Sequence, residues 1–538
     1  MASSKARHTT VTAREYAGSD ETTPLLPSST PIPKLISKAS PRTLIILVIV
    51  VILLASCGDQ LMESPQTRIF ESVICYRYYE ATDPSKLLVG REAVGPGAIG
   101  GVAEMWCKVS PVQSKVASLR GWQFTLEGIP SLLLALPAGW AADTIGRKPV
   151  AILGLLAFPL RAAWMQLVTF FWQAFDVRMS WISAVFASIG GGSTALTSVM
   201  YVIVSDITTE ANRANVFVLL SGFNLLAALF MPPLAALLME TNPWIACLAG
   251  TCLQLLAIPT FLFFPETLNY NHSPPPPIVP EPTTAPHGNH ADSPAPPPGF
   301  WRALPTRSKN ATAFLTRDWR ILALTAPFPF LFLGGNATQL LIQYVSARYE
   351  IKLSKAILIT TIRMIVVTII LFAGLPLLSK LLLRKYAFSP RRKDLNLGRL
   401  SLLFGALGWI LCGFAPTIPV VIVALTISAL GVGSVPMLRS FITSIVEKQH
   451  IARVYAIITV LDTLGGMAGS PVMAKLFSRG FALGGYWTGL PFYFLGSMTG
   501  ACAVLIFGVN LRKGEDVCAV QDSEEEEEEA REEEVPTV

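Results

Sequence analysis

The sequence predicts an all-α membrane protein whose twelve transmembrane helices form two six-helix, pseudo-repeat halves. Three observations support this fold class. The 538-residue chain is 52% hydrophobic and only 14% charged, whereas a soluble protein carries roughly 25% charged residues. It contains twelve apolar runs close to the length of about 20 residues that a membrane-spanning helix requires. Polar landmarks also recur at matching places in the two halves of the chain.

Twelve apolar runs are expected to cross the membrane. Proline marks the boundary between the ninth and the tenth of them, which hydrophobicity alone does not show. The ninth and tenth runs are continuous in hydrophobicity, but Pro416 and Pro419 separate them, because proline removes a backbone donor and ends a helix. The expected spans are 43–62, 121–142, 149–172, 180–205, 214–239, 243–264, 321–346, 356–379, 400–415, 419–446, 453–476 and 486–510.

The segments outside the spans complete the expected domain organisation. Residues 1–42 predict a disordered cytosolic tail rather than a cleaved signal. Residues 511–538 end in glutamate runs and predict a solvated, acidic cytosolic tail. The Pro-rich segment 265–320 predicts a cytosolic linker, which joins the N-terminal half at 43–264 to the C-terminal half at 321–510.

The distribution of cations gives the expected orientation. Lysine and arginine crowd the links after the sixth and eighth spans, whereas most links on the other face are short and nearly free of them. By the positive-inside rule, the cation-rich links and both termini are expected in the cytosol. The segment 63–120 would then be an extracellular or luminal loop. The link 347–355, which contains Arg348, Lys352 and Lys355, is a local conflict with this orientation.

The link between the second and third spans contains the densest polar motif, G-x-x-x-D-x-x-G-R-K. Gly139 is expected to let two helices approach closely, and Gly146 to let the backbone reverse. Arg147 and Lys148 favour the cytosolic side. Asp143 stands where a carboxylate could cap a helix N-terminus or pair with a cation. A degraded copy, Asp394 to Arg399, precedes the ninth span, as expected for a two-half transporter with its site at the interface.

This motif resembles the loop 2–3 signature of the major facilitator superfamily. Other stretches resemble a fungal branch of it that is distantly similar to proton-coupled folate and heme-type solute carriers. These stretches are Arg68 to Cys75 with Tyr78-Tyr79, Cys107-Lys108 with Val112-Gln113, Gly121-Trp122-Gln123, and Pro265 to Leu268. The resemblance covers about 43 to 512. It implies the twelve-helix fold and alternating access driven by an ion gradient, but it names no substrate.

The resemblance also implies a gate at the cytosolic face. Asp143 and Arg147 would form a latch that holds the outward-open state, with Asp206 as ion partner and Arg213 on the same face. A charge pair that forms in one state and breaks in the other biases the equilibrium between them. The fifth span lacks the glycine-rich G-P signature of drug–proton antiporters, so the sequence leaves the direction of transport open.

Proton coupling would require a carboxylate, because all five histidines fall in loops or tails. A charge inside a span costs about 2.5–3.5 kcal/mol on insertion scales, so each such residue is a candidate for a functional role. Glu127 in the second span is the first candidate, because a carboxylate in an apolar site could load and release a proton near neutral pH. The alternative is that Glu127 is a solvated carboxylate near the outer membrane interface with no role in coupling. Asp462 in the eleventh span is the second candidate, with the same alternative.

Three groups of residues are candidates for the substrate cavity. Arg439 in the tenth span could pair with an anionic substrate, although an internal ion pair or a snorkelling side chain is equally compatible with the sequence. Polar residues share one helix face in the seventh span and in the fourth, where they could line a cavity or join helices. These residues are Asn336, Gln339 and Gln343, and Thr194, Ser198 and Tyr201.

Cysteine and motif content narrow the chemistry further. Cys75 and Cys107 both lie in the segment 63–120, where an oxidising compartment would permit a disulfide between them; two free thiols are the alternative. The sequence shows no Walker-type phosphate loop, no metal-ligand cluster and no nucleophile–base pair. We therefore expect no cofactor, no metal and no enzymatic activity.

These observations predict a fungal secondary active transporter of a small organic solute, coupled to protons and embedded as a monomer in the plasma or vacuolar membrane. Efflux of a secondary metabolite or xenobiotic is the first hypothesis. Uptake of an organic anion or nutrient is the second. A third is a non-transporting sensor or scaffold that acts through its tails. The net charge of +6 is small and does not indicate nucleic acid as a partner.

Overall fold

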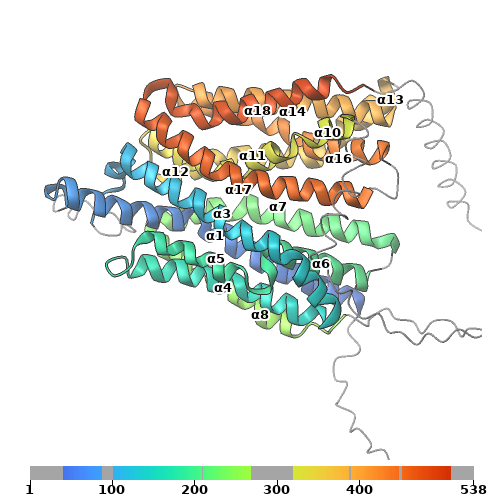
Figure 1. Ribbon diagram of the computed structural model, residues 1–538, viewed down its shortest axis with the longest axis horizontal. Helices are drawn as coiled ribbons and strands as arrows, with labels where there is room; N and C mark the ends of the chain where they lie inside the picture. Colours follow the sequence, from blue (N-terminus) through green and yellow to red (C-terminus); the bar gives the residue numbers. More distant parts are fainter. Residues whose placement is uncertain are drawn as a thin grey trace, which may run out of the picture. The chain divides into compact units, whose positions relative to one another are not determined.

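A computed structural model describes residues 40–87, 101–208, 210–267, 319–386, 389–446 and 451–510. Every regular element in these ranges is a helix. Ten of the helices are long and apolar enough to cross a membrane, or up to twelve if each of two bent pairs is one span. The predicted all-α fold class is therefore confirmed (Figure 1).

In the described part of the N-terminal half, five continuous long helices accompany one bent span, which follows the third of them. The bent span turns by 79° where Gly190, Gly191 and Gly192 all adopt positive φ angles, a conformation that glycine reaches without steric cost. The elements are α1 (Pro41–Thr82), η1 (Glu104–Lys108), α3 (Ser110–Thr144), α4 (Arg147–Phe170), η2 (Val177–Ile182), α5 (Ser183–Ala187), η3 (Ile189–Gly191), α6 (Gly192–Ile207), α7 (Glu210–Thr241) and α8 (Pro243–Leu262).

The C-terminal half repeats the pattern with more interruptions. Its ninth and tenth spans separate at Pro416 and Pro419, as the sequence predicted. The elements are α10 (Trp319–Thr325), α11 (Phe328–Arg348), α12 (Leu353–Ile369), η4 (Ile370–Gly374), α13 (Leu375–Tyr386), α14 (Pro390–Phe414), α15 (Ile418–Leu430), η5 (Gly431–Gly433), α16 (Ser434–Ile445), α17 (Ile451–Leu483), η7 (Gly485–Gly489) and α18 (Leu490–Phe507).

The two halves meet along two helix pairs, α3 with α17 and α7 with α12. Glycine makes the first of these contacts possible: a Cβ added at Gly121 of α3 would lie 3.0 Å from the carbonyl oxygen of Ser470 on α17. Figure 1 shows α17, in orange, beside α3 along this boundary. Small residues at such crossings let helix backbones approach closely.

The first predicted loop is the main correction to the sequence analysis. The segment 63–120 was expected to be a loop, but α1 continues to Thr82 and α3 begins at Ser110. The spans 43–62 and 121–142 were therefore drawn too short. The apolar runs end there because charged residues begin, yet Arg68, Glu71 and Lys108 are all at least 90% buried. Buried charges that pair with one another can be accommodated within helical structure.

The cores of the two halves use large apolar side chains at helix crossings. Tyr344, Trp409 and Phe492 pack together between α11, α14 and α18, with stacked or edge-to-face rings. Arg348 donates to the carbonyl oxygen of Gly413 over 2.9 Å and also contacts the Tyr344 hydroxyl. One cation of the conflicting 347–355 link is thus used to hold two helix ends together.

The predicted tails and linker fall mostly outside the described residues. At the linker's start, however, Glu266 and Thr267 belong to the folded half, because Thr267 is 2% exposed and Glu266 accepts hydrogen bonds from α4. At its end, α10 already begins at Trp319. The boundary of the N-terminal half therefore lies beyond the predicted 264.

Candidate functional site

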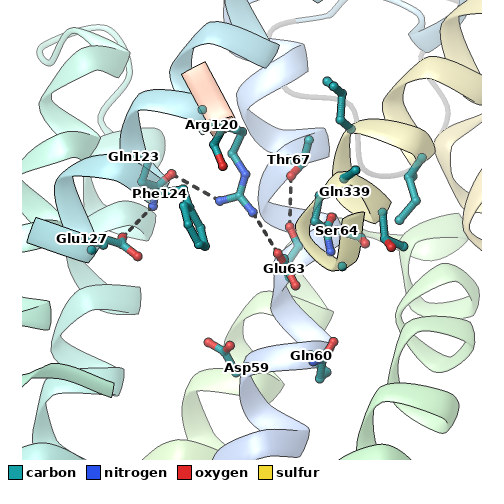
Figure 2. Close-up of a pocket in the computed structure, with 18 of the residues that line it drawn as sticks. Asp59, Gln60, Glu63, Ser64, Thr67, Arg120, Gln123, Phe124, Glu127 and Gln339 are labelled. Atoms are coloured by element: carbon teal, nitrogen blue, oxygen red, sulfur yellow. Dashed lines mark hydrogen bonds and ion pairs between the residues drawn. The ribbon is translucent and has the colours of Figure 1, made fainter. Parts of the chain in front are cut away.

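A cavity of about 590 Å³ lies between the two halves. Its walls come from α1, α3, α4, α5, α6 and α7 on one side and from α11, α12 and α17 on the other. Figure 2 shows side chains of α1 and α3 facing the same space as Gln339 of α11. A cavity bounded by both halves is the place where a solute could contact both of them.

The N-terminal wall of the cavity carries ionisable side chains. Two carboxylates stand four residues apart on α1 and therefore share one face of that helix. A second helix adds a guanidinium and a carboxylate, and a third adds another guanidinium. These five residues are Asp59 and Glu63 on α1, Arg120 and Glu127 on α3, and Arg161 on α4.

Glu127 is the most firmly held of the three carboxylates. Its Oε2 lies 3.2 Å from Nη1 of Arg161. Its Oε1 accepts hydrogen bonds from Gln123 Nε2 and from Ser183 Oγ, both over 3.0 Å. Arg161 also pairs with Asp59 of α1. One guanidinium thus joins three helices, and Glu127 lies in the middle of α3.

Glu63 is held more loosely. Its Oε1 lies 3.5 Å from Nη2 of Arg120, and its side chain is 30% exposed. Arg120 divides its donors, because Nη1 donates to Oε1 of Gln123 over 3.2 Å. Figure 2 shows these contacts as one chain running from Glu63 through Arg120 and Gln123 to Glu127. The three carboxylates of this wall face two guanidinium groups, which leaves one formal negative charge.

The C-terminal wall is chemically different. Among the lining residues that the structure describes, α11, α12 and α17 contribute no ionisable side chain. Their lining side chains are apolar, hydroxyl or amide groups. The larger ones are Phe332, Leu333, Gln339, Leu340, Ile342, Gln343, Met364, Met467 and Met473, and the hydroxyls are Thr338, Thr360, Thr361, Thr463 and Ser470.

The predicted cavity residues divide between several locations. Thr194, Gln339 and Gln343 line the cavity. Tyr201 instead lines a smaller space of about 280 Å³ between α1, α4, α6 and α7, which shares Asp59 and its neighbours Gln60 and Phe158 with the larger one. Ser198 is in neither lining and donates to the Thr194 carbonyl oxygen over 3.0 Å. The side chain of Asn336 lies outside the described part of the structure.

The predicted anion anchor and the second predicted coupling residue form one ion pair. Nη2 of Arg439 lies 3.2 Å from Oδ2 of Asp462, and the guanidinium lies 5.5 Å from the ring centroid of Phe328. Neither residue lines either cavity. In this structure Arg439 thus forms the internal ion pair that the sequence had left as an alternative, and its contact with a substrate stays a prediction.

The turn between α3 and α4 is built around Gly146, whose φ of +125° requires glycine. Arg147 forms an ion pair with Asp206 of α6. The carboxylate of Glu266 accepts hydrogen bonds from the backbone nitrogens of Arg147 and Lys148, each over 3.0 Å. Glu266 thus supplies the negative charge that the N-terminus of α4 favours. The Lys148 ammonium donates to the carbonyl oxygen of Leu262 over 2.8 Å.

Three expectations about this turn need correction or lie beyond the structure. A Cβ added at Gly139 would meet nothing within 4 Å, so no close helix approach occurs there. Asp143 is exposed and makes no ion pair with the described residues, because Glu266, far away in sequence, occupies the capping position. The side chain of Arg213 lies outside the described residues.

The opposite end of the bundle contains the disulfide between Cys75 and Cys107, whose Cα atoms lie 5.3 Å apart. It joins α1 to η1 beside a buried ion cluster. The Glu71 carboxylate accepts from Lys108 Nζ over 2.8 Å and from Gln113 Nε2 over 2.5 Å. The sequence analysis missed this cluster, although Arg68 with Glu71 and Glu104 with Lys108 show helical spacing.

Glu104 links this cluster to the other half. Its Oε1 accepts from the backbone nitrogen of Leu353, at the start of α12, over 2.6 Å. Burial raises the pKa of Glu104, but Lys108, Arg68 and the Leu353 hydrogen bond outweigh burial and lower it to about 2. Gln343 of α11 donates to the carbonyl oxygen of Gln113 over 2.8 Å. The halves are therefore joined at the disulfide end of the bundle.

Comparisons with known proteins agree with this architecture. A relative named "MFS efflux pump atnC" from Emericella nidulans is 28% identical over 465 residues, 85% of this chain and 86% of the relative. "Efflux pump ustT" from Aspergillus flavus is 26% identical over 444 residues, 80% of this chain and 82% of the relative.

Solved structures show the same fold at low sequence identity. The nucleoside transporter NupG aligns with a TM-score of 0.55 at 13% identity, over 86% of this chain and 98% of its own. The human organic anion transporter MFSD10 (TETRAN) aligns with a TM-score of 0.52 at 17% identity, over 87% of this chain and 100% of its own. The family model described as Major Facilitator Superfamily matches residues 116–470. With well over half of its length matched by that model, the chain belongs to the major facilitator superfamily, a family of multi-pass membrane transporters rather than enzymes.

Proposed function

We propose that this chain exports a small organic product of fungal secondary metabolism, by alternating access and in exchange for protons. The observation that carries the proposal is the cavity between the halves, with a charged N-terminal wall and an uncharged C-terminal wall. The efflux pumps named among its fungal relatives, which align over four fifths or more of both chains, support the outward direction. Kinship to folate and heme carriers stays a prediction.

The described contacts support a state in which the disulfide end of the cavity is closed. Hydrogen bonds from Gln343 to Gln113 and from Leu353 to Glu104 cross between the halves there. In the orientation expected from the cations, this end faces away from the cytosol. The cargo would enter from the cytosol and leave after these contacts break.

The turn at Gly146 is proposed to act as the conformational gate in a modified form. The predicted latch joined Asp143 and Arg147, with Asp206 as ion partner. The structure contains the pair of Arg147 with Asp206, whereas Asp143 makes no ion pair with the described residues. Since α4, α6 and the end of α8 are held together by Arg147, Asp206 and Glu266, this cluster would make the cytosolic end of the N-terminal half move as one unit.

Proton coupling is proposed for the carboxylates of the N-terminal wall, of which Glu127 is one. An unbalanced charge inside a membrane protein is costly, so the wall favours a state in which one carboxylate carries a proton. The alternative hypothesis, uptake of an organic anion, loses its support because Arg439 is paired with Asp462 away from the cavity. The sensor hypothesis concerns tails that lie outside the described residues.

The test is transport by the purified protein in proteoliposomes. A pH gradient of either sign is imposed, and a fungal metabolite extract is screened for compounds that move. Wild type should move a compound against the direction of proton flow, and Glu127→Gln should reduce this flux. Glu240→Gln is the matched control, since Glu240 is exposed near the end of α7. Movement in the same direction as protons would establish uptake instead, and no movement of any compound would favour the sensor hypothesis.

A further inference from the structure

We propose that the cavity binds an amphipathic organic cation, and that Glu63 is the carboxylate at which this cation and a proton replace one another. The inference rests on the proposed export function and deepens it, because it names the class of the cargo and the residue where exchange occurs. The evidence is the charge balance of the cavity, the unequal bonding of its carboxylates and the chemistry of its opposite wall.

The charge balance favours a cation as the bound group. The charged groups that line the cavity come from three helices, with Asp59 beside Glu63 on α1, Arg120 and Glu127 on α3, and Arg161 on α4. The described lining residues of the other helices are uncharged. One negative charge remains unmatched, and an uncompensated charge in a partly dehydrated site is energetically costly. Either a proton or a cationic ligand would remove that cost.

The bonding pattern identifies which carboxylate exchanges its partner. Glu127 accepts from three side chains, and Asp59 pairs with the same Arg161. Among the described residues, the Glu63 carboxylate has one ion-pair partner, Arg120, at 3.5 Å. Protonating Glu63 therefore breaks the fewest hydrogen bonds. The Glu63 side chain is also 30% exposed. A ligand could therefore reach this weakly paired carboxylate.

The opposite wall suits an apolar body attached to the cation. Met364, Met467 and Met473 line it together with Phe332, and methionine side chains adapt to ligands of varied shape. Hydroxyls from α12 and α17 add hydrogen-bonding groups without adding charge. A ligand with a cationic end and a hydrophobic body would thus neutralise Glu63 while packing on the C-terminal wall.

This arrangement makes exchange follow from charge balance. The cavity is neutral when Glu63 carries a proton and neutral again when a monovalent cation replaces that proton. The doubly loaded state carries excess positive charge, and the empty, ionised state carries excess negative charge. Cation binding should therefore release about one proton, and by linkage a lower pH should weaken cation binding.

Binding to purified wild type in a neutral detergent tests the cargo class. The probes are tetraphenylphosphonium, a lipophilic cation, and tetraphenylborate, an anion of matched size. We expect the cation to bind at least tenfold more tightly at pH 8 than at pH 5.5, and to release about one proton per molecule when it binds at pH 5.5 in weakly buffered solution. Equal or tighter binding of the anion, or cation binding without proton release, would overturn the proposal.

Variants test the assignment to Glu63. Glu63→Gln should abolish both proton release and the pH dependence of cation binding, whereas Glu63→Asp should retain them. Glu240→Gln, at an exposed position, should behave as wild type. If Glu63→Gln released the same proton as wild type, another carboxylate would be the exchange site and the proposal would be wrong. The wild-type measurement decides the cargo class even if Glu63→Gln does not fold.

The same protein in proteoliposomes separates this inference from the proposed function. Gradient-driven export of neutral or anionic compounds, together with no binding of tetraphenylphosphonium, would overturn the cationic cargo and leave the exporter intact. Absence of gradient-driven flux of every compound tested would overturn the proposed function and this inference together. Proton-driven flux of the cation, lost in Glu63→Gln, would support both.

Discussion

The two halves share one fold but use their buried charges differently. In the N-terminal half, the guanidinium of Arg161 joins Asp59 and Glu127 on the wall of the cavity. In the C-terminal half, Arg363 is 7% exposed and donates to the Ser428 hydroxyl over 3.2 Å, with its guanidinium 5.3 Å from the Trp409 ring centroid. Its other mid-span cation, Arg439, pairs with Asp462 away from the cavity.

This difference separates two tasks that a transporter must perform. Charges that face a cavity can respond to protons and ligands, because the species that neutralises them can change. Charges that bond to hydroxyls, rings or a carboxylate of their own half, outside the cavity, have partners fixed by the fold. In the proposed mechanism, the C-terminal half would contribute packing surface, and the N-terminal half would contribute the charges that a proton or ligand can neutralise.

The largest expected effect is a loss of stability, and it tests the difference between the two halves most directly. Arg161→Leu leaves Asp59 and Glu127 without their shared cation. Removing one partner of a fully buried ion pair costs about 3–5 kcal/mol, so this partly buried cluster should lose up to about that amount. The side chain of Arg439 is 37% exposed. Arg439→Leu should therefore destabilise the protein markedly less than Arg161→Leu. Thermal unfolding in detergent compares the two variants. Equal destabilisation would show that the charges of the two halves are not distinct in kind.

The second effect concerns the bridge that the N-terminal half extends to α12. The pKa of Glu104 falls from about 4.5 to about 2 on folding. A depressed carboxyl pKa contributes stability that is complete above pH 4.5 and is lost as the pH falls toward 2. Wild type should therefore lose stability across this window, and Glu104→Gln should lose much of that pH dependence.

The matched control for Glu104→Gln is Glu350→Gln, in the C-terminal half. Glu350 is exposed between α11 and α12, so its removal should leave the acid-induced loss of stability as in wild type. The measurement is the unfolding temperature at steps between pH 5 and pH 3. A Glu104→Gln curve parallel to wild type would mean that other groups govern the acid sensitivity.

The third effect compares the two carboxylates that the sequence proposed for proton coupling. Glu127→Gln should lower gradient-driven flux about tenfold, which is about 1.4 kcal/mol, because Arg161 would lose half of its counter-charge. Asp462→Asn should change flux less than about twofold, since Asp462 lies outside the cavity. A larger loss for Asp462→Asn would place coupling in the C-terminal half and reverse the comparison.

How much of this could be predicted from the sequence depends on the range of the interactions. Apolar runs and the turn at Gly146 are local features, so the helix order and the Pro416 break were predictable. Partner choice is not local: Arg161 meets Asp59 from 102 residues away. Arg439 and Asp462 were placed in separate roles because spacing along one helix does not reveal a neighbour on another.

Glu63 was not among the predicted site residues, and the reason is similar. The first span was ended at residue 62, because hydropathy falls where the charged residues begin. Helix α1 nevertheless continues for 20 residues beyond that point, to Thr82. The pairing with Arg120 that allows a carboxylate there becomes visible only once α1 and α3 are packed together. Hydropathy alone therefore underestimates the length of a helix whose charged side chains pair with one another or with a neighbouring helix.

The smallest expected effect sharpens the comparison at the turn between α3 and α4. Glu266→Ala removes the carboxylate that accepts from the first backbone nitrogens of α4, and loss of such a cap costs about 1 kcal/mol. Asp143→Ala should cost less, because Asp143 is exposed and caps nothing among the described residues. Chemical or thermal unfolding of the two variants in one detergent makes the comparison. If Asp143→Ala were the more destabilising, the cap at the start of α4 would belong to the motif itself rather than to the end of the N-terminal half.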